Sequence, residues 1–265
     1  KIPTYDVNVQ KFLNWQKEHE MNLDLESTDK LKVHRAPVKE KINIDIDLRS
    51  LDDLISVIDT YPLDDTKEYN IDIKALHKIS TELKQLQKMI GLTTFKTSVL
   101  KQILYFIQGF TQDSHGDYKH TVITGPPGTG KTEIAKIIGN MYSKIGILKN
   151  NVFKKVTRSD LVAGYLGQTA IKTRKKIDEC LGGVMFIDEA YSLQTDDMYA
   201  KECVDTLCEA LSDHKKDLMV IIAGYENELN EKFFKINNGL PSRFVWRFNI
   251  NEYDAKELYD IFVCM

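Results

Sequence analysis

The stretch GPPGTGKT, Gly125–Thr132, decides the fold that this sequence predicts. It matches the pattern G-x-x-x-x-G-K-[ST], whose glycines let the backbone wrap around phosphate groups and point its N–H groups at them. The apolar run HTVIT (120–124) precedes it, and the helix-period segment EIAKIIGNMY (133–142) follows it. Because a helix N-terminus adds partial positive charge, a strand, this loop and a helix in that order indicate a phosphate-binding site.

The side chains of this loop indicate ATP with Mg²⁺ as the ligand. Lys131 is expected to contact the β- and γ-phosphates and to assist catalysis, and the Thr132 hydroxyl is expected to bind Mg²⁺. All eight residues of the loop are expected to bind the nucleotide: Gly125, Pro126, Pro127, Gly128, Thr129, Gly130, Lys131 and Thr132.

A second motif, VMFIDEA (184–190), supplies two carboxylates at the end of a buried apolar run. Ligands of open α/β sheets bind at the carboxyl ends of the strands. Asp188 is therefore expected to bind the nucleotide by holding its Mg²⁺, and Glu189 to orient and deprotonate the attacking water as the catalytic base. Two alternatives stay open: surface acids without function at a strand end, and a site that binds ATP without splitting it.

Outward from these motifs, short apolar runs alternate with helix-period segments. This alternation is typical of an α/β protein with a parallel sheet between helices. We expect a P-loop NTPase core over residues 81–253 with a five-stranded parallel sheet. Its strands are expected at residues 120–124, 152–157, 184–188, 218–224 and 244–250.

Residues 1–80 are expected to form a separate acidic region with a small α+β fold and an unknown role. The alternation of apolar and polar residues in KINIDIDL (41–48) predicts a strand, and YNIDI (69–73) a second one. Ser50 and Asp53 are spaced as a capping box, which predicts that a short helix starts there.

Composition narrows the classes of partner. The 36 Lys and Arg residues against 39 Asp and Glu residues leave a net charge of −3, which disfavours a nucleic-acid binder. The sequence contains no run of 18 apolar residues, so no membrane span and no membrane partner are expected. The four cysteines form no C-x-x-C pair and are expected to be buried, reduced thiols of an intracellular, cytoplasmic protein.

Together, the motifs resemble those of the AAA+ ATPases, and more narrowly the clade of red-type Rubisco activase, stage V sporulation protein K and the type VII secretion ATPases. The similarity covers about residues 81–265. In composition and in its N-terminal region, the chain is also similar to uncharacterised AAA+ proteins of large DNA viruses, which would make it virus-encoded. The segments that carry the main resemblance are IGL (90–92), GPPGTGKT (125–132), RSDLVAGYLGQTAIKTR (158–174), GGVMFIDEAYSL (182–193), VIIAGY (220–225) and GLPSRF (239–244).

The resemblance implies further contacts to the nucleotide. Ile90 and Gly91 would lie against the adenine. Many AAA+ proteins carry an Asn or Thr sensor at the end of the fourth strand, where this chain reads AGY, Ala223–Tyr225. Tyr225 is expected to contact the nucleotide there, and the sensing chemistry of this segment stays open.

The resemblance also implies assembly into a ring. Arg243 of GLPSRF would act as a catalytic arginine finger that reaches the nucleotide of the neighbouring subunit, since charge on the γ-phosphoryl oxygens calls for a cation. Arg247 is the competing candidate, and a surface salt bridge is the alternative role for Arg243. The expected assembly is a homo-hexamer.

A loop between the two motifs indicates what ATP hydrolysis would move. Tyr165, Leu166 and Gly167 follow the second strand and match the aromatic–aliphatic–glycine triplet that lines the pore of AAA+ unfoldases. The resemblance therefore implies a remodeller that threads a protein substrate, unless Tyr165 packs against its own domain. The alternatives are an AAA+ ATPase acting on nucleic acid, through KTRKK (172–176), and a scaffold whose assembly ATP controls.

The end of the sequence predicts the start of one more helix. Asp254 and Glu257 are spaced as a capping box within DAKELYDIFVCM, which ends at Met265. In the family a C-terminal helical lid with a second sensor arginine follows, so residues 254–265 are expected to be its start, with the rest of the lid missing from this sequence.

Overall fold

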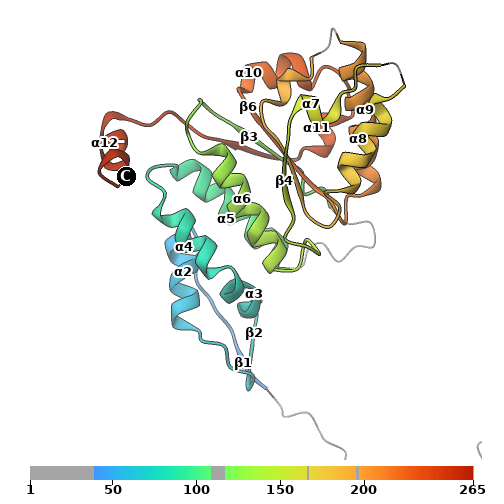
Figure 1. Cartoon of the computed structure of the whole chain (residues 1–265). Helices are drawn as coiled ribbons and strands as arrows, with labels where there is room; N and C mark the ends of the chain where they lie inside the picture. Colours follow the sequence, from blue (N-terminus) through green and yellow to red (C-terminus); the bar gives the residue numbers. More distant parts are fainter. Residues whose placement is uncertain (1–38, 109–116, 166, 195–196, 265) are drawn as a thin grey trace, which may run out of the picture. The chain divides into compact units, whose positions relative to one another are not determined.

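The computed structural model describes residues 39–108, 117–165, 167–194 and 197–264. The chain divides into two compact units, residues 1–39 and 40–265, and the account below concerns the second. Its centre is a parallel sheet in the order β4-β5-β6-β3-β7 (Figure 1). The strands are β3 (Thr121–Thr124), β4 (Phe153–Val156), β5 (Val184–Ile187), β6 (Met219–Gly224) and β7 (Trp246–Asn249). The predicted five-stranded parallel sheet of a P-loop NTPase is thus confirmed.

Helices cover both faces of this sheet and define two buried clusters. Val122 and Ile123 are neighbours in β3 yet belong to different clusters, because successive strand side chains point to opposite faces. Strands β3, β5 and β6 are buried along their whole length, which explains their continuous apolar sequences. One face carries α2 (Leu51–Thr60), α3 (Ile73–Lys78), α4 (Ser80–Lys88), α5 (Thr93–Ile107) and α6 (Lys131–Lys144); the other carries α7 (Arg158–Leu161), α8 (Thr169–Asp178), α9 (Met198–Asp213) and α11 (Leu240–Arg243).

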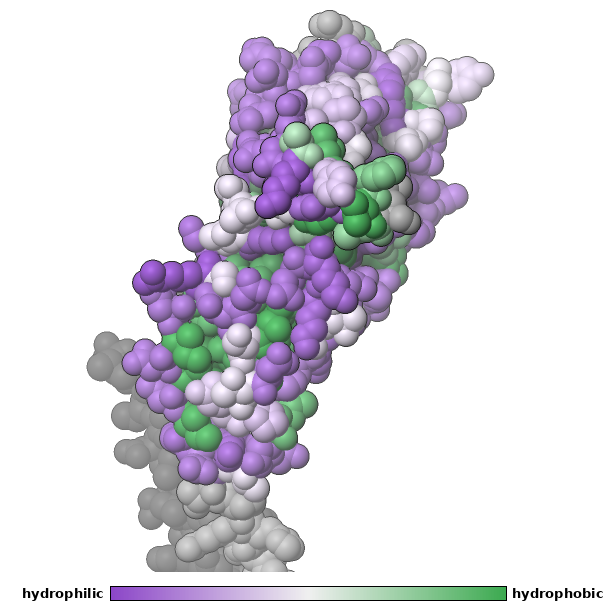
Figure 2. Space-filling view, turned by 90° about the vertical axis from the view of Figure 1, so that its left-hand side faces the viewer, coloured by the Kyte–Doolittle hydropathy of each residue, from purple (hydrophilic) through white to green (hydrophobic). Residues whose placement is uncertain are grey.

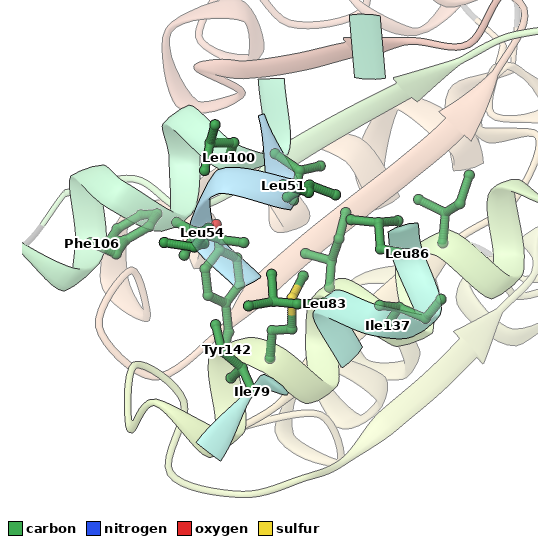
Figure 3. Close-up of a cluster of buried hydrophobic side chains, with 14 of the residues drawn as sticks. Leu51, Leu54, Ile79, Leu83, Leu86, Leu100, Phe106, Ile137 and Tyr142 are labelled. Carbon is green, nitrogen blue, oxygen red and sulfur yellow. The ribbon is translucent and has the colours of Figure 1, made fainter. Parts of the chain in front are cut away.

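Residues before position 81 share a core with the helices that follow. Figure 3 shows side chains of α2, α4, α5 and α6 meeting in one apolar cluster. At its edge, the buried Glu82 forms an ion pair with Lys144, with 2.7 Å between the closest atoms, and so ties α4 to α6. Residues 44–79 thus pack as part of the same unit as the nucleotide core, while the domain boundary at residue 80 stays a prediction. The labelled members of the cluster are Leu51, Leu54, Ile79, Leu83, Leu86, Leu100, Phe106, Ile137 and Tyr142.

The two strands predicted near the start of the chain are shorter than expected. β1 (Glu40–Ile42) and β2 (Lys67–Tyr69) pair in parallel, and the ladder then ends. The Asn70 side chain accepts a hydrogen bond from Ile44 N at 2.9 Å and donates one to Ile44 O at 3.2 Å, so a side chain replaces the next strand residue. The predicted strand over 69–73 is therefore largely wrong, since Ile73 already begins α3.

The predicted helix starts are confirmed at both ends of this unit. Ser50 and Asp53 form a reciprocal capping box at the start of α2. Asp254 and Glu257 do the same before α12 (Ala255–Cys264), with bonds of 2.9 and 2.7 Å. The surface view in Figure 2 shows hydrophobic side chains on α12, where Leu258, Tyr259, Phe262 and Val263 are exposed.

Three short helical segments complete the described part of the fold. They are η1 (Ala190–Ser192), α10 (Glu226–Glu228) and η2 (Leu229–Phe233). Across the described residues, no helix is long and apolar enough to cross a membrane. The four cysteines are free, and Cys264 is exposed, which corrects the expectation that all four are buried. It lies at the end of α12, outside both apolar clusters.

Candidate nucleotide-binding site

The phosphate loop joins the carboxyl end of β3 to the first turn of α6. Gly130 directly precedes that helix with φ of 84°, a left-handed conformation that glycine adopts without strain. A Cβ on Gly125 would lie 2.7 Å from the carbonyl oxygen of Ile250, so only glycine fits there. Gly125 N also donates to Gly224 O at 3.2 Å, which fixes the loop against the end of β6.

Lys131 is folded back onto its own loop. Its ammonium donates to Gly125 O at 3.0 Å and to Pro126 O at 2.6 Å. Burial lowers the pKa of Lys131, and the nearby charges of Asp188 and Glu189 act in the opposite direction. The Lys131 ammonium is thus held at the rim of the loop by two backbone carbonyl groups.

Asp188 is positioned by the end of β5. Its carboxylate pairs with the ammonium of Lys155 at 2.7 Å. Lys155 lies on β4, opposite Phe186 in the ladder, so the strand register places this cation beside Asp188. The Asp188 carboxylate is half-buried, and carboxylate oxygens are a type of ligand that Mg²⁺ prefers.

Glu189 stands on an unusual backbone. Its φ of 50° and ψ of 49° are left-handed values, which cost energy for any residue with a Cβ. The turn carries the chain away from β5 into η1 and leaves the Glu189 side chain exposed. Burial, and after it the charge of Glu189, raises the pKa of Tyr191, on η1, to about 12.

These groups surround a cavity of about 450 Å³, a size within the usual range for small-molecule sites. Gly128, on its wall, would meet no atom within 4 Å if it carried a Cβ, so the space beside the loop is open. Open space along backbone N–H groups, the ammonium of Lys131 and the carboxylate of Asp188 together fit a nucleoside triphosphate with Mg²⁺. The lining residues are Gly125, Pro127, Gly128, Gly130, Lys131, Thr132, Glu133, Asp188, Glu189, Tyr191, Gly224 and Tyr225.

The predicted adenine contacts lie at the border of this cavity. Ile90 and Gly91 are half-buried and are outside its lining, but the preceding residue, Met89, approaches the loop: its Cε would be 3.6 Å from a Cβ on Gly130. A Cβ on Gly91 would collide with the carboxylate of Glu257 from α12. The described residues thus bring segment 89–91 beside the loop, with Glu257 next to it.

The two candidate arginine fingers are engaged elsewhere in the chain. Arg243 donates to Ser212 Oγ at 2.7 Å and to Gly239 O at 2.8 Å. Arg247 lies over the ring of Phe234, 4.5 Å from its centroid. Neither lines the cavity, so the role proposed for Arg243 requires a second copy of the chain.

The predicted pore loop joins α7 to α8. Tyr165 is 74% exposed, and Gly167 has a φ of 75°; Leu166 lies outside the described residues. The base of the loop is held at both ends, because Lys172 Nζ donates to Val162 O at 2.9 Å and Ala163 N donates to Thr169 Oγ1 at 3.2 Å. Tyr165 is therefore presented to solvent from a fixed base.

Sequence reasoning missed three residues at this site. Lys155, Glu133 and Tyr191 were given no role, although Tyr191 lies within a segment that carries the family resemblance. Tyr191 comes two positions after Glu189 in FIDEAYSL, so its place in the motif was the one available signal. No signal in the sequence indicated the contact of Lys155 with Asp188, because that contact depends on which strand lies beside β5.

Comparison with known proteins identifies the domain. The family described as "ATPase family associated with various cellular activities (AAA)" matches residues 121–251. The putative cfxQ-like protein R730 of Acanthamoeba polyphaga mimivirus is 36% identical over 217 residues, which are 80% of this chain and 53% of that protein. The ESX-1 secretion system protein EccA1 of Mycobacterium tuberculosis is 37% identical over 187 residues, which are 67% of this chain and 32% of that protein.

The chain spans only part of these relatives: about half the length of the mimivirus protein and about a third of the secretion protein. Among solved structures, the FIGL-1 AAA domain in complex with ADP is similar, with 21% identity and a TM-score of 0.43 over 68% of this chain and 56% of that one. None of the relatives named here is described as a Rubisco activase or a sporulation protein, so that narrower placement stays a prediction.

Proposed function

Because residues 121–251 form a domain of the AAA ATPase family, we propose that this chain binds ATP with Mg²⁺, hydrolyses it, and uses the energy to remodel a protein substrate within a ring. The observation that carries the proposal is the cavity where β3, β5 and β6 end, with Lys131, Asp188 and Glu189 around it. A cation, a metal-binding carboxylate and a base at one opening are the parts that phosphoanhydride hydrolysis requires.

Each part has a separate task. The backbone N–H groups of the loop and the start of α6 bind the phosphates, and Lys131 exchanges its two carbonyl partners for phosphate oxygens. Asp188 and the Thr132 hydroxyl hold Mg²⁺, directly or through water. When bound, the metal neutralises charge on the phosphates. Glu189 orients a water molecule and accepts its proton at a carboxylate oxygen.

The cavity lacks one component that a ring would supply. No arginine is among the described residues that line it, and Lys131 is its basic side chain. Stabilising charge on the transferred phosphoryl group calls for a further cation. We propose that Arg243 of a neighbouring copy provides it, after exchanging its bonds to Ser212 and Gly239, and that the assembly is a homo-hexamer.

The loop at Tyr165 supports a polypeptide substrate. A large exposed aromatic side chain on a fixed base can grip a chain without reading its sequence, since aromatic groups bury much apolar area. The similarity to proteins named as secretion system proteins makes an exported polypeptide one candidate substrate.

The basic segment proposed for nucleic acid has other partners. Lys172 donates to two backbone carbonyls, Arg174 pairs with Glu209, and Lys176 pairs with Glu179. Phosphate binding would have to replace these contacts, so the structure favours protein over nucleic acid as the substrate class.

The test is phosphate release by the purified chain with an unfolded protein or with single-stranded DNA added. We expect the unfolded protein alone to stimulate turnover, and Tyr165→Ala to lose the stimulation while keeping basal turnover. Tyr259→Ala removes another exposed tyrosine and serves as the control. Stimulation by DNA alone would support the nucleic-acid alternative. If neither Tyr165→Ala nor Tyr259→Ala loses the stimulation, Tyr165 is not the residue that grips the substrate.

A further inference from the structure

We propose that Lys155 regulates the entry of Mg²⁺: its ammonium competes with the bare metal ion for the Asp188 carboxylate, so that the metal binds together with ATP and not ahead of it. The inference rests on the nucleotide site proposed above and assigns control of its metal to one residue. The contact that carries it is the ion pair between Lys155 Nζ and Asp188 Oδ2, at 2.7 Å.

The register of the sheet delivers this cation to the face that carries the phosphate loop. Lys155 lies opposite Phe186 in the β4–β5 ladder, and Asp188 comes two positions after Phe186. Phe186 belongs to the apolar cluster that contains residues of α6, the helix that starts at the phosphate loop. Because side chains alternate along a strand, the preceding residue, Lys154, points to the opposite face, where it pairs with Glu179 at 3.0 Å. Of these two neighbouring lysines, Lys155 is thus the one that reaches the candidate site.

Lys155 reduces the negative charge of the cavity from outside its wall. Among the described residues that line the cavity, Glu133, Asp188 and Glu189 are acidic and Lys131 is basic. Three carboxylates against one ammonium leave an excess of two negative charges, which the Lys155 ammonium lowers to one. A bare divalent cation is therefore attracted less strongly than the carboxylates alone would attract it, and the phosphates of ATP supply further negative charge.

The ammonium and the metal compete for the same carboxylate. Mg²⁺ gives up its hydration waters reluctantly and usually binds through one or two carboxylates together with substrate phosphates. Asp188 Oδ2 already accepts a hydrogen bond from Lys155, so bare Mg²⁺ would have to break an ion pair to bind that oxygen. Phosphate oxygens add ligands and charge, and with them the metal can displace the ammonium.

The exposure of the ion pair makes this control reversible. The side chain of Lys155 is 49% exposed and that of Asp188 is 26% exposed. Ion pairs so accessible to water are weak, whereas a buried pair is costly to break. The ammonium can therefore turn into solvent when metal and nucleotide arrive together. The pair thus discriminates against the bare metal without closing the site to the metal–nucleotide complex.

The test follows the unfolding temperature against MgCl₂ concentration, without nucleotide and at constant ionic strength, since a metal that binds the folded chain raises that temperature. Lys155→Met keeps the aliphatic stem and removes the charge. We expect its affinity for Mg²⁺ to be about tenfold tighter than that of the wild-type chain, the effect of one charge beside a divalent cation in largely aqueous surroundings. Lys154→Met is the matched control: it removes the neighbouring ammonium, also paired with a carboxylate, and should leave the affinity unchanged.

Two further variants locate the effect. Asp188→Asn in the Lys155→Met background should abolish the gain, and Lys155→Arg, which keeps the charge, should behave like the wild-type chain. Equal Mg²⁺ affinity in the wild-type chain and Lys155→Met would overturn the proposal, as would an equal gain in Lys154→Met or a gain that survives Asp188→Asn. An unfolding temperature lowered equally at every Mg²⁺ concentration would also overturn it, because the ion pair would then be purely structural. If Lys155→Met does not fold, Lys155→Gln is titrated in its place.

This result is separable from that of the proposed function, because the titration involves neither nucleotide nor turnover. If Lys131→Ala keeps wild-type affinity for ATP, the nucleotide site itself is wrong. If Lys131→Ala loses affinity while Lys155→Met binds Mg²⁺ like the wild-type chain, only the role of Lys155 is wrong.

Discussion

Replacing Lys131 by alanine tests the phosphate site at its most specific side chain. In the free protein the ammonium donates to two carbonyls, Gly125 O and Pro126 O. Bound ATP would exchange these partners for phosphate oxygens. An ammonium about 4 Å from one phosphate charge gains about 4 kcal/mol at an effective dielectric constant of about 20. The two carbonyl bonds that it gives up contribute about 1 kcal/mol each.

The difference leaves about 2 kcal/mol, which corresponds to an affinity about thirtyfold weaker in Lys131→Ala. The assay is calorimetric titration with a non-hydrolysable ATP analogue and Mg²⁺, after the unfolding temperature has shown that the variant is folded. Lys149→Ala is the control, since it removes one exposed positive charge, paired with Asp217, outside the cavity. Wild-type affinity in folded Lys131→Ala would refute the assignment of the loop.

Three further predictions concern assembly, pH and packing. Arg243→Ala should keep nucleotide affinity and abolish the rise of specific activity with protein concentration; concentration-independent wild-type activity would count against a trans role. Burial lowers the pKa of His120 to about 3, so the unfolded chain binds a proton below pH 6.5 that the folded chain does not. Unfolding free energy from urea titration should therefore be about 3 kcal/mol lower at pH 4.5 than at pH 7.5, with a weaker dependence in His120→Gln; equal dependence would refute this. Gly139→Ala places a Cβ 2.9 Å from Val184 Cγ2, and we expect a net loss of up to about 2 kcal/mol of stability, whereas a higher unfolding temperature would contradict the close packing.

The parts of the fold that the sequence predicted are those with local signals. Each strand of the sheet is a short apolar run beside a helical segment, and the phosphate loop has fixed spacing between Gly125 and Lys131. Both capping boxes were also local, since each needs two side chains three positions apart. Long-range pairing had no such signal: the contact between Asn70 and Ile44 ended the β1–β2 ladder earlier than the alternation of residues 41–48 suggested.

The candidate site also combines residues that local motifs predicted with contacts that depend on long-range pairing. Lys131, Asp188 and Glu189 follow from motifs, and the structure brings them to one cavity. The pairing of Asp188 with Lys155 depends on the order of strands in the sheet, which no local pattern encodes. The contact of Tyr191 with Gly224 depends on the left-handed turn at Glu189, a conformation that the residue type does not predict.

The most direct test of hydrolysis is phosphate release by Glu189→Gln beside the wild-type chain, with nucleotide affinity measured on the same samples. Glutamine keeps the shape of the side chain and cannot accept the proton of water. We predict unchanged affinity and turnover reduced by about a hundredfold or more. Equal turnover in the two proteins, at equal affinity, would contradict the assignment of this cavity as an ATPase site with Glu189 as its base.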